Sequence, residues 1–155
     1  MTNKIQYLSN STEETIKIGC KLGTEVKSHL LNKEKYIIIG INGPLGSGKT
    51  TFIKGLAKSL GITTPVTSPT YQLVNNYQSS SIINESYLKL YHIDLYRINS
   101  LSEFNSLALD DFIYDKGTVT IIEWADKALQ ILPDDIIAVK ISVKGTGDRA
   151  IVIIL

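Results

Sequence analysis

The chain has 155 residues, of which 43% are apolar and 20% charged, the composition of an ordinary globular protein. This length favours a single domain over residues 1–155 with a sizeable core. Sixteen basic and fifteen acidic residues leave a net charge of +1, so bulk charge gives no support for nucleic-acid binding. Cys20 is the single cysteine and excludes an internal disulfide. Since we find neither an apolar leader nor a membrane-length apolar stretch, we expect a cytoplasmic protein with no membrane partner.

The first half of the chain predicts a helix, a strand and a second helix, in that order. Residues 11–14 read Ser-Thr-Glu-Glu, a capping box, so the first helix is expected to begin near Thr12. Residues 36–41 form a short apolar run rich in isoleucine and predict a buried strand. Residues 51–60 carry apolar side chains at helical spacing before Gly61, so they predict a helix that ends there.

The second half of the chain predicts strands alternating with loops and short helices. Residues 63–70 hold two prolines among threonine and serine, and they predict a loop. The further predicted elements are a strand at 71–77, a polar turn at 79–81, a hairpin partner strand at 87–96, an irregular helix at 101–112, a strand at 118–122, a short helix at 125–132, and final strands at 136–143 and 150–155 joined by a turn at 145–148.

Between the first predicted strand and the second helix the sequence reads GPLGSGKT, which matches the Walker A pattern G-x-x-x-x-G-K-[ST]. Glycines let a phosphate chain approach the backbone N–H groups, and the following helix adds the positive end of its dipole. In such a loop Lys49 reaches the β- and γ-phosphates and the Thr50 hydroxyl binds Mg²⁺. We therefore predict a site for ATP and Mg²⁺ whose nucleotide-binding residues include Gly43, Pro44, Leu45, Gly46, Ser47, Gly48, Lys49, Thr50 and Thr51. These elements predict an α/β three-layer P-loop NTPase fold, with a mixed, mostly parallel central sheet and antiparallel hairpin additions.

Hydrolysis also needs a carboxylate for Mg²⁺ and a group that orients water. Two acids follow predicted strands: Glu123 ends the apolar run 118–122, and Asp94 ends the strand before it. Because its strand is more uniformly apolar, we assign Glu123 to the metal, directly or through water, and Asp94 to a supporting or water-orienting role. The alternative is that either acid is a plain surface residue at the end of a strand.

Four blocks of sequence together resemble one family. They are residues 43–50, residues 66–75 (VTSPTYQLVN), residues 92–97 (HIDLYR) and residues 121–124 (IIEW). In this order they are similar to the TsaE family, formerly YjeE, the small bacterial ATPases of tRNA threonylcarbamoyladenosine biosynthesis. The resemblance runs from the first helix to the C-terminus, and its most specific parts are the Ser-Pro-Thr and His-x-Asp-Leu-Tyr-Arg blocks.

The resemblance implies a role for several residues of this chain. Lys49 and Thr50 would bind phosphate and Mg²⁺, and Thr70 would lie near the γ-phosphate in a loop like the family's switch I. Asp94 matches the family's essential carboxylate and Glu123 its Walker B acid. The predicted catalytic residues are therefore Lys49, Thr70, Asp94 and Glu123, and the predicted metal ligands are Thr50 and Glu123.

The resemblance also implies partners. Members of the family act with TsaB and TsaD, and their ATP turnover resets TsaD, which modifies the tRNA; this chain would meet tRNA only through that complex. The sequence departs from the family pattern at three points: Pro44 replaces an acid, Asn76 replaces a glutamate, and Leu107–Ala108 replaces a Leu-Gly pair. None of these departures removes a proposed catalytic group.

Four other side chains have an expected setting, and for two of them the sequence leaves two alternatives open. Trp124, next to Glu123, either stacks on adenine or packs in the core. His92 is expected to form a structural hydrogen bond. Arg97 either pairs with Asp94 or approaches phosphate, whereas Arg149 is expected to meet solvent or a partner. With no arginine placed at the site, we expect weak ATP turnover by the chain alone and stimulation by its partners.

Three other functions compete with an ATPase. A small-molecule kinase would need lid arginines, and the chain holds two arginines in all. A GTPase commonly selects guanine with Asn-Lys-x-Asp, whereas residues 32–35 read Asn-Lys-Glu-Lys and precede the glycine loop. A non-hydrolysing assembly module would also bind nucleotide, and separate measurements of binding and turnover distinguish it from an enzyme.

Overall fold

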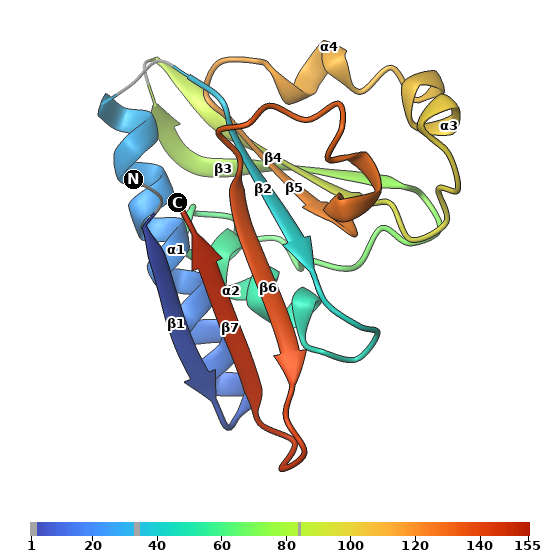
Figure 1. The fold of residues 1–155 in the computed structure, drawn as a ribbon. Helices are drawn as coiled ribbons and strands as arrows, with labels where there is room; N and C mark the ends of the chain where they lie inside the picture. Colours follow the sequence, from blue (N-terminus) through green and yellow to red (C-terminus); the bar gives the residue numbers. More distant parts are fainter. Residues whose placement is uncertain (1–2, 33–34, 84) are drawn as a thin grey trace.

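The computed structural model describes residues 3–32, 35–83 and 85–155 of the chain (Figure 1). Its elements in chain order are β1 (Lys4–Ser9), α1 (Thr12–Asn32), β2 (Ile37–Asn42), α2 (Lys49–Ser59), β3 (Val74–Ile83), β4 (Ser86–Asp94), α3 (Leu101–Ser106), α4 (Asp110–Ile113), β5 (Thr118–Glu123), the 3₁₀ helix η1 (Ala125–Ala128), β6 (Ile137–Val143) and β7 (Arg149–Ile154). Helix α1 starts at Thr12 as expected, because Ser11 Oγ accepts from the N–H of Glu14 at 3.1 Å; the Glu14 carboxylate reaches one residue beyond the expected capping box and accepts from the N–H of Asn10 at 2.7 Å. No helix among these residues is long and apolar enough to cross a membrane.

Seven strands form one mixed sheet in the order β1-β7-β6-β2-β5-β4-β3. The pairs β2/β5, β2/β6 and β4/β5 are parallel, whereas β1/β7, β6/β7 and β3/β4 are antiparallel. The α/β class and the antiparallel hairpins follow the sequence prediction. The sheet is partly rather than mostly parallel, because hairpins extend the parallel centre on both sides.

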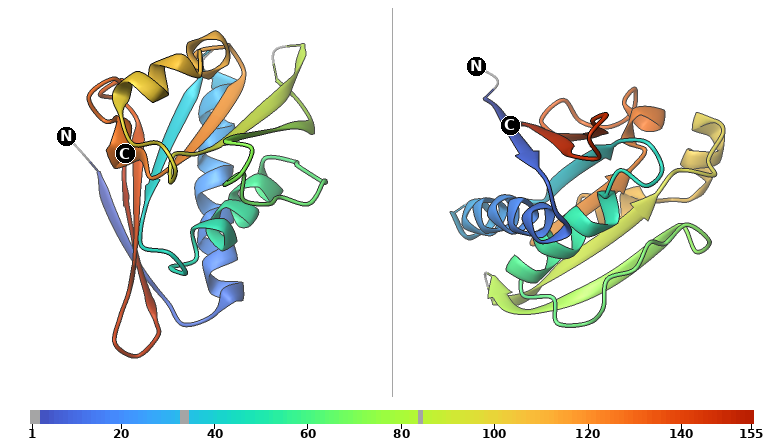
Figure 2. Two further views of the ribbon diagram at one scale, coloured as in Figure 1. Left: turned by 90° about the vertical axis from the view of Figure 1, so that its right-hand side faces the viewer. Right: turned by 90° about the horizontal axis from the view of Figure 1, so that it is seen from below.

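Helices cover both faces of the sheet (Figure 2). On one face α1 and α2 pack against alternate residues of the central strands, among them Ile39 and Ile121. On the other face α3, α4 and η1 pack against the intervening residues, such as Ile38 and Ile122. The centre of β2 and all of β5 are therefore buried on both sides, as expected for apolar parallel strands.

Helices α1 and α2 are in close backbone contact because glycines lie where they meet. A Cβ added at Gly23 would lie 2.6 Å from the carbonyl oxygen of Leu56. One added at Gly55 would overlap the carbonyl group of Ile16, with 2.8 Å to its carbon. The long helix α1 thus supports the shorter α2, whose first residue is Lys49.

The structure differs from the sequence predictions at five places. The strand predicted at 71–77 starts only at Val74, because the residues before it form a turn in which the N–H of Leu73 donates to the carbonyl of Pro69 at 2.7 Å. The edge strand β1 was not predicted, since its alternating pattern is short and half polar. Residues 79–81 continue β3 rather than turn: the Ser79 hydroxyl donates to the carbonyl of Leu60 at 2.5 Å, and the strand bulges between Gln78 and Ile82. The helix predicted at 101–112 is split into α3 and α4 around Ala108, whose φ is 49°. The helix predicted at 125–132 is only the 3₁₀ turn η1.

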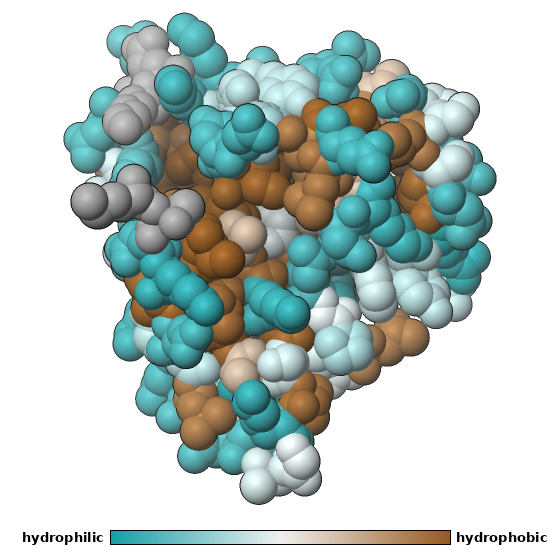
Figure 3. Space-filling view, viewed as in Figure 1, coloured by the Kyte–Doolittle hydropathy of each residue, from teal (hydrophilic) through white to brown (hydrophobic). Residues whose placement is uncertain are grey.

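Apolar side chains are exposed between polar ones on the face seen in Figure 3. A cavity of about 560 Å³ lies beside Asn3 and Leu155. It is lined mostly by apolar groups, chiefly those of α1 and β2. Its lining includes none of the residues to which the sequence assigns a role. The chemistry is concentrated at a different, smaller cavity.

Candidate functional site

The glycine loop joins the carboxyl end of β2 to the start of α2. Gly46 and Gly48 have φ values of 75° and 98°, a region that favours glycine. The N–H of Ser47 donates to the carbonyl of Pro44 at 3.1 Å, which closes a tight turn. This strand, loop and helix sequence is the arrangement that the motif requires, with the N-terminus of α2 directed at the loop.

Lys49 is buried at the base of this loop. Only 6% of the residue is exposed, and its Nζ donates to the carbonyls of Gly43 at 2.8 Å and Pro44 at 3.1 Å. Burial lowers the pKa of Lys49 below 10.5, and the charges of Glu123 and Asp94 oppose that shift. Backbone oxygens, rather than a contacting carboxylate, hold the ammonium group, so it can exchange these contacts for those of an anionic ligand.

Asp94 and Glu123 lie side by side at the carboxyl ends of two parallel strands. They are register partners in the β4/β5 pair, and each is 3% exposed. Because side chains alternate along a strand, both acids point to the face covered by α2, the face to which Leu90 and Ile121 also contribute. With Lys49, they line a cavity of about 350 Å³.

Asp94 connects the cavity to the loop before β3. Its Oδ2 accepts from the hydroxyl of Thr70 at 2.9 Å and from that of Ser68 at 3.3 Å. Its Oδ1 accepts from the N–H of Tyr96 at 2.9 Å. The Asp94 carboxylate thus links the cavity directly to the Ser-Pro-Thr segment.

Glu123 is held by the histidine of the neighbouring strand. His92 Nε2 lies 2.7 Å from Glu123 Oε1, and both side chains are buried. An ionised carboxylate only accepts, so Nε2 carries the proton of this hydrogen bond. The structural role predicted for His92 agrees with this contact. Within the described part of the chain no residue bonds to the second oxygen of Glu123, which stays available to a ligand.

The predicted residues divide into two groups by position. Ten of them line the cavity: Leu45, Gly46, Gly48, Lys49, Thr50, Thr51, Thr70, Asp94, Glu123 and Trp124. Gly43, Pro44 and Ser47 do not line it and instead shape the loop behind it. Three lining residues had no predicted place there: Ser68, Tyr96 and Arg149. Ser68 and Tyr96 lie inside the sequence blocks that resemble the family, each two residues from a predicted site residue. That proximity is the signal that could have identified them.

Oxygen donors suited to Mg²⁺ are present, but they do not form a closed cage. Across the described residues, no three His, Cys, Asp or Glu side chains converge on one point. Mg²⁺ usually takes one or two carboxylates and completes its shell with water and phosphate oxygens. The Thr50 hydroxyl and the Glu123 carboxylate in one cavity fit that donor set.

Aromatic groups form one wall of the cavity. Trp124, in a left-handed conformation with φ of 58°, has its ring 4.7 Å from Lys49 Nζ and tilted against the ring of Tyr96 at 5.3 Å. Trp124 also packs against the core that α3, α4 and η1 form, so the core setting is confirmed, and stacking on adenine stays a prediction.

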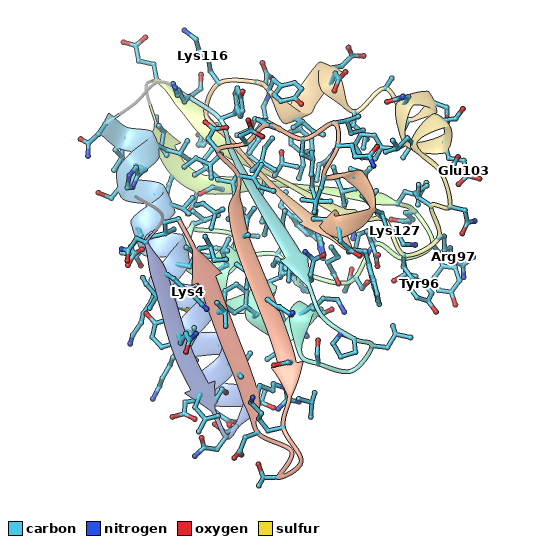
Figure 4. All side chains as sticks on the ribbon, in the orientation of Figure 1. Lys4, Tyr96, Arg97, Glu103, Lys116 and Lys127 are labelled. Atoms are coloured by element: carbon cyan, nitrogen blue, oxygen red, sulfur yellow. The ribbon has the colours of Figure 1, made fainter. Side chains whose placement is uncertain are left out.

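The two arginines lie elsewhere than predicted. Arg97 neither pairs with Asp94 nor lines the cavity, because its guanidinium stacks over the ring of Tyr71 at 4.4 Å. It lies with Tyr96 and Lys127 at one end of the sheet (Figure 4). Arg149 is partly buried, and its Nε donates to the Ser47 carbonyl at 2.9 Å, a contact that the sequence did not predict. The register of β7 against β6 places it there, which no local sequence pattern shows.

Comparison with known proteins finds one family. The profile of the TsaE family, described as threonylcarbamoyl adenosine biosynthesis protein TsaE, matches residues 9–151. A TsaE protein of Treponema pallidum is 33% identical over 149 residues, covering 96% of this chain and 99% of its own. One of Borreliella burgdorferi is 43% identical over 111 residues, covering 71% and 76%. The crystal structure of Bacillus subtilis YdiB is similar with a TM-score of 0.73 and 28% identity, over 99% of this chain and 86% of that one.

Proposed function

The chain belongs to the TsaE family of tRNA threonylcarbamoyladenosine biosynthesis, and we propose that within this process it is a Mg²⁺-dependent ATPase. The observation that carries this proposal is the pairing of Asp94 with Glu123 in one cavity with Lys49 and Thr50. A phosphate-binding loop alone holds a nucleotide, whereas hydrolysis also requires carboxylates at that place.

Each group has a distinct task in the proposed reaction. The amides of the loop and the Lys49 ammonium bind the phosphate tail of ATP. Thr50 and Glu123 would hold Mg²⁺, which neutralises charge on the phosphates when bound. Asp94 accepts hydrogen bonds from Thr70 and Ser68, and it would orient the attacking water. Trp124 and Tyr96 cover one side of the cavity and limit the access of bulk water.

Binding and turnover measured separately on acid variants test whether this site hydrolyses ATP. Glu123→Gln and Asp94→Asn keep the size of each side chain but remove its charge. We expect both variants to bind ATP and to turn it over at least tenfold more slowly than the unchanged protein. ATP bound by the unchanged protein without turnover, even with its partners present, would favour a non-hydrolysing assembly module.

The proposed setting is the cytoplasm, in a complex with TsaB and TsaD through which tRNA is reached. The expectation of weak turnover alone rested on the absence of an arginine at the site, and Arg149 removes that reason. We retain the proposal that partners accelerate turnover, because the loop bound to Asp94 continues to Tyr71, which is 84% exposed and offers a partner a surface beside the site. Steady-state ATP hydrolysis with and without TsaB–TsaD tests it, and equal rates would contradict it.

A further inference from the structure

We propose that Arg149 is a phosphate-binding residue of this site, supplied by the same chain from the first position of β7. The inference rests on the ATP binding proposed above and adds a residue that the motif does not contain. It concerns the triphosphate tail, and the ligand chemistry is that of a polyphosphate anion.

The geometry places the guanidinium against the glycine loop. Arg149 Nε donates to the carbonyl oxygen of Ser47 at 2.9 Å. A Cβ at Gly48 would lie 2.8 Å from the same Nε and 3.1 Å from Cδ, so the loop and the arginine are in direct contact. Arg149 also lines the cavity that Lys49 and Thr50 share.

The backbone that carries Arg149 is fixed on both sides. It pairs with Val143 of β6 and with Ser9 of β1, at the end of both antiparallel ladders of β7. A residue held by two neighbouring strands presents its side chain with little backbone freedom. This distinguishes Arg149 from an arginine on a mobile loop.

The charge of Arg149 has no acidic partner among the residues that the structure describes. The ion pairs found there are Lys89 with Asp115 and His92 with Glu123. A guanidinium carries five N–H donors, and the Ser47 carbonyl uses only the one on Nε. An uncompensated planar cation beside the glycine loop matches phosphate oxygens, which arginine binds through paired hydrogen bonds.

The competing explanation is that Arg149 only braces the loop through Ser47. The two roles respond differently to substitution. Arg149→Lys keeps the positive charge but loses the fork and the Nε contact, whereas Arg149→Gln loses the charge as well. A brace would be lost equally in both variants, whereas a phosphate ligand would be retained in part by lysine.

The test titrates Mg·ATP, and separately tripolyphosphate with Mg²⁺, into the full chain by calorimetry, alongside thermal unfolding without ligand. The matched control is Lys144→Gln, which removes one exposed charge from the same hairpin outside the cavity. We expect Arg149→Gln to weaken both ligands at least tenfold, Arg149→Lys to weaken them less, and Lys144→Gln to stay within twofold. Unfolding temperatures without ligand should change little.

Several results would overturn the proposal. Unchanged affinity in Arg149→Gln would do so while leaving the ATPase function intact. Equal losses in Arg149→Gln and Arg149→Lys would identify a brace instead. If Arg149→Gln does not fold, Arg149→Lys decides: a loss of affinity smaller than tenfold supports the proposal. A loss of more than tenfold in Arg149→Lys, or no loss at all, would overturn it, because lysine keeps the charge but not the paired donors. If the unchanged protein binds neither ligand, the proposed function itself fails, and this inference fails with it.

Discussion

Replacing Gly55 with alanine tests the close contact between α1 and α2 that supports the glycine loop. The new Cβ would overlap the carbonyl oxygen of Ile16 and lie 2.8 Å from its carbonyl carbon and 3.0 Å from its Cα. All three atoms belong to the backbone of α1, so no side-chain rotation relieves the clash. Favourable carbon contacts lie near 3.5–4.0 Å, so the two helices must separate by roughly 1 Å.

Two opposing effects set the size of the change in stability. Alanine is favoured over glycine inside a helix by about 1 kcal/mol. Overpacking of a core typically costs about 1–3 kcal/mol, and a backbone clash belongs at the upper end. We therefore expect Gly55→Ala to lower the free energy of unfolding by about 2 kcal/mol, which corresponds to a fall in Tm of roughly 4–8 °C for a chain of this size.

Urea and thermal unfolding followed by circular dichroism measure this change. Gly145→Ala is the matched control, because Gly145 has no positive φ and no atom within 4 Å of an added Cβ. The control should change the free energy of unfolding by no more than about 0.5 kcal/mol. A neutral or more stable Gly55→Ala, as helix propensity alone predicts, would refute the close packing of α1 on α2.

Three further predictions concern the site and Tyr114, which packs at the edge of the core that α3, α4 and η1 form. His92→Phe leaves the buried carboxylate of Glu123 without its donor and should lower the free energy of unfolding by about 1–3 kcal/mol; an unchanged urea midpoint would count against that hydrogen bond. Thr70→Val removes the hydroxyl that donates to Asp94, so ATP turnover should fall severalfold while Thr70→Ser stays near normal, and equal rates for the two variants would exclude this contact from turnover. Burial raises the pKa of Tyr114 above 10.0, so the unfolded chain loses this proton first as the pH rises. Stability of the unchanged protein should therefore fall relative to Tyr114→Phe above pH 10 but not below it, and parallel stability profiles across that pH would contradict the shift.

The part of the site that depends on local chain order could be predicted from the sequence. The strand, glycine loop and helix are consecutive, so their spacing places Lys49 and Thr50 together. Asp94 and Glu123 could be placed at strand ends, but their direct pairing depends on the register of β4 against β5. Sequence patterns indicate that a strand exists and leave its register open.

The parts that sequence reasoning missed depend on contacts between distant segments. Strand β1 is short and half polar, and its partner β7 stands at the other end of the chain. The serines at 79–81 favour a turn locally, yet one of them is satisfied by the carbonyl of Leu60 at the end of α2. Arg149 reaches the glycine loop only because β7 returns beside β6. In each case tertiary pairing overrides a weak local signal.

The central claim is that phosphate, Mg²⁺ and two acids meet in the cavity beside the glycine loop. Calorimetric titration of ATP with Mg²⁺, and again with the metal removed by chelator, tests it most directly. Our account predicts binding that Mg²⁺ strengthens in the unchanged protein, and loss of that Mg²⁺-dependent gain in Glu123→Gln. Absence of ATP binding with Mg²⁺, even in the presence of TsaB and TsaD, would contradict it.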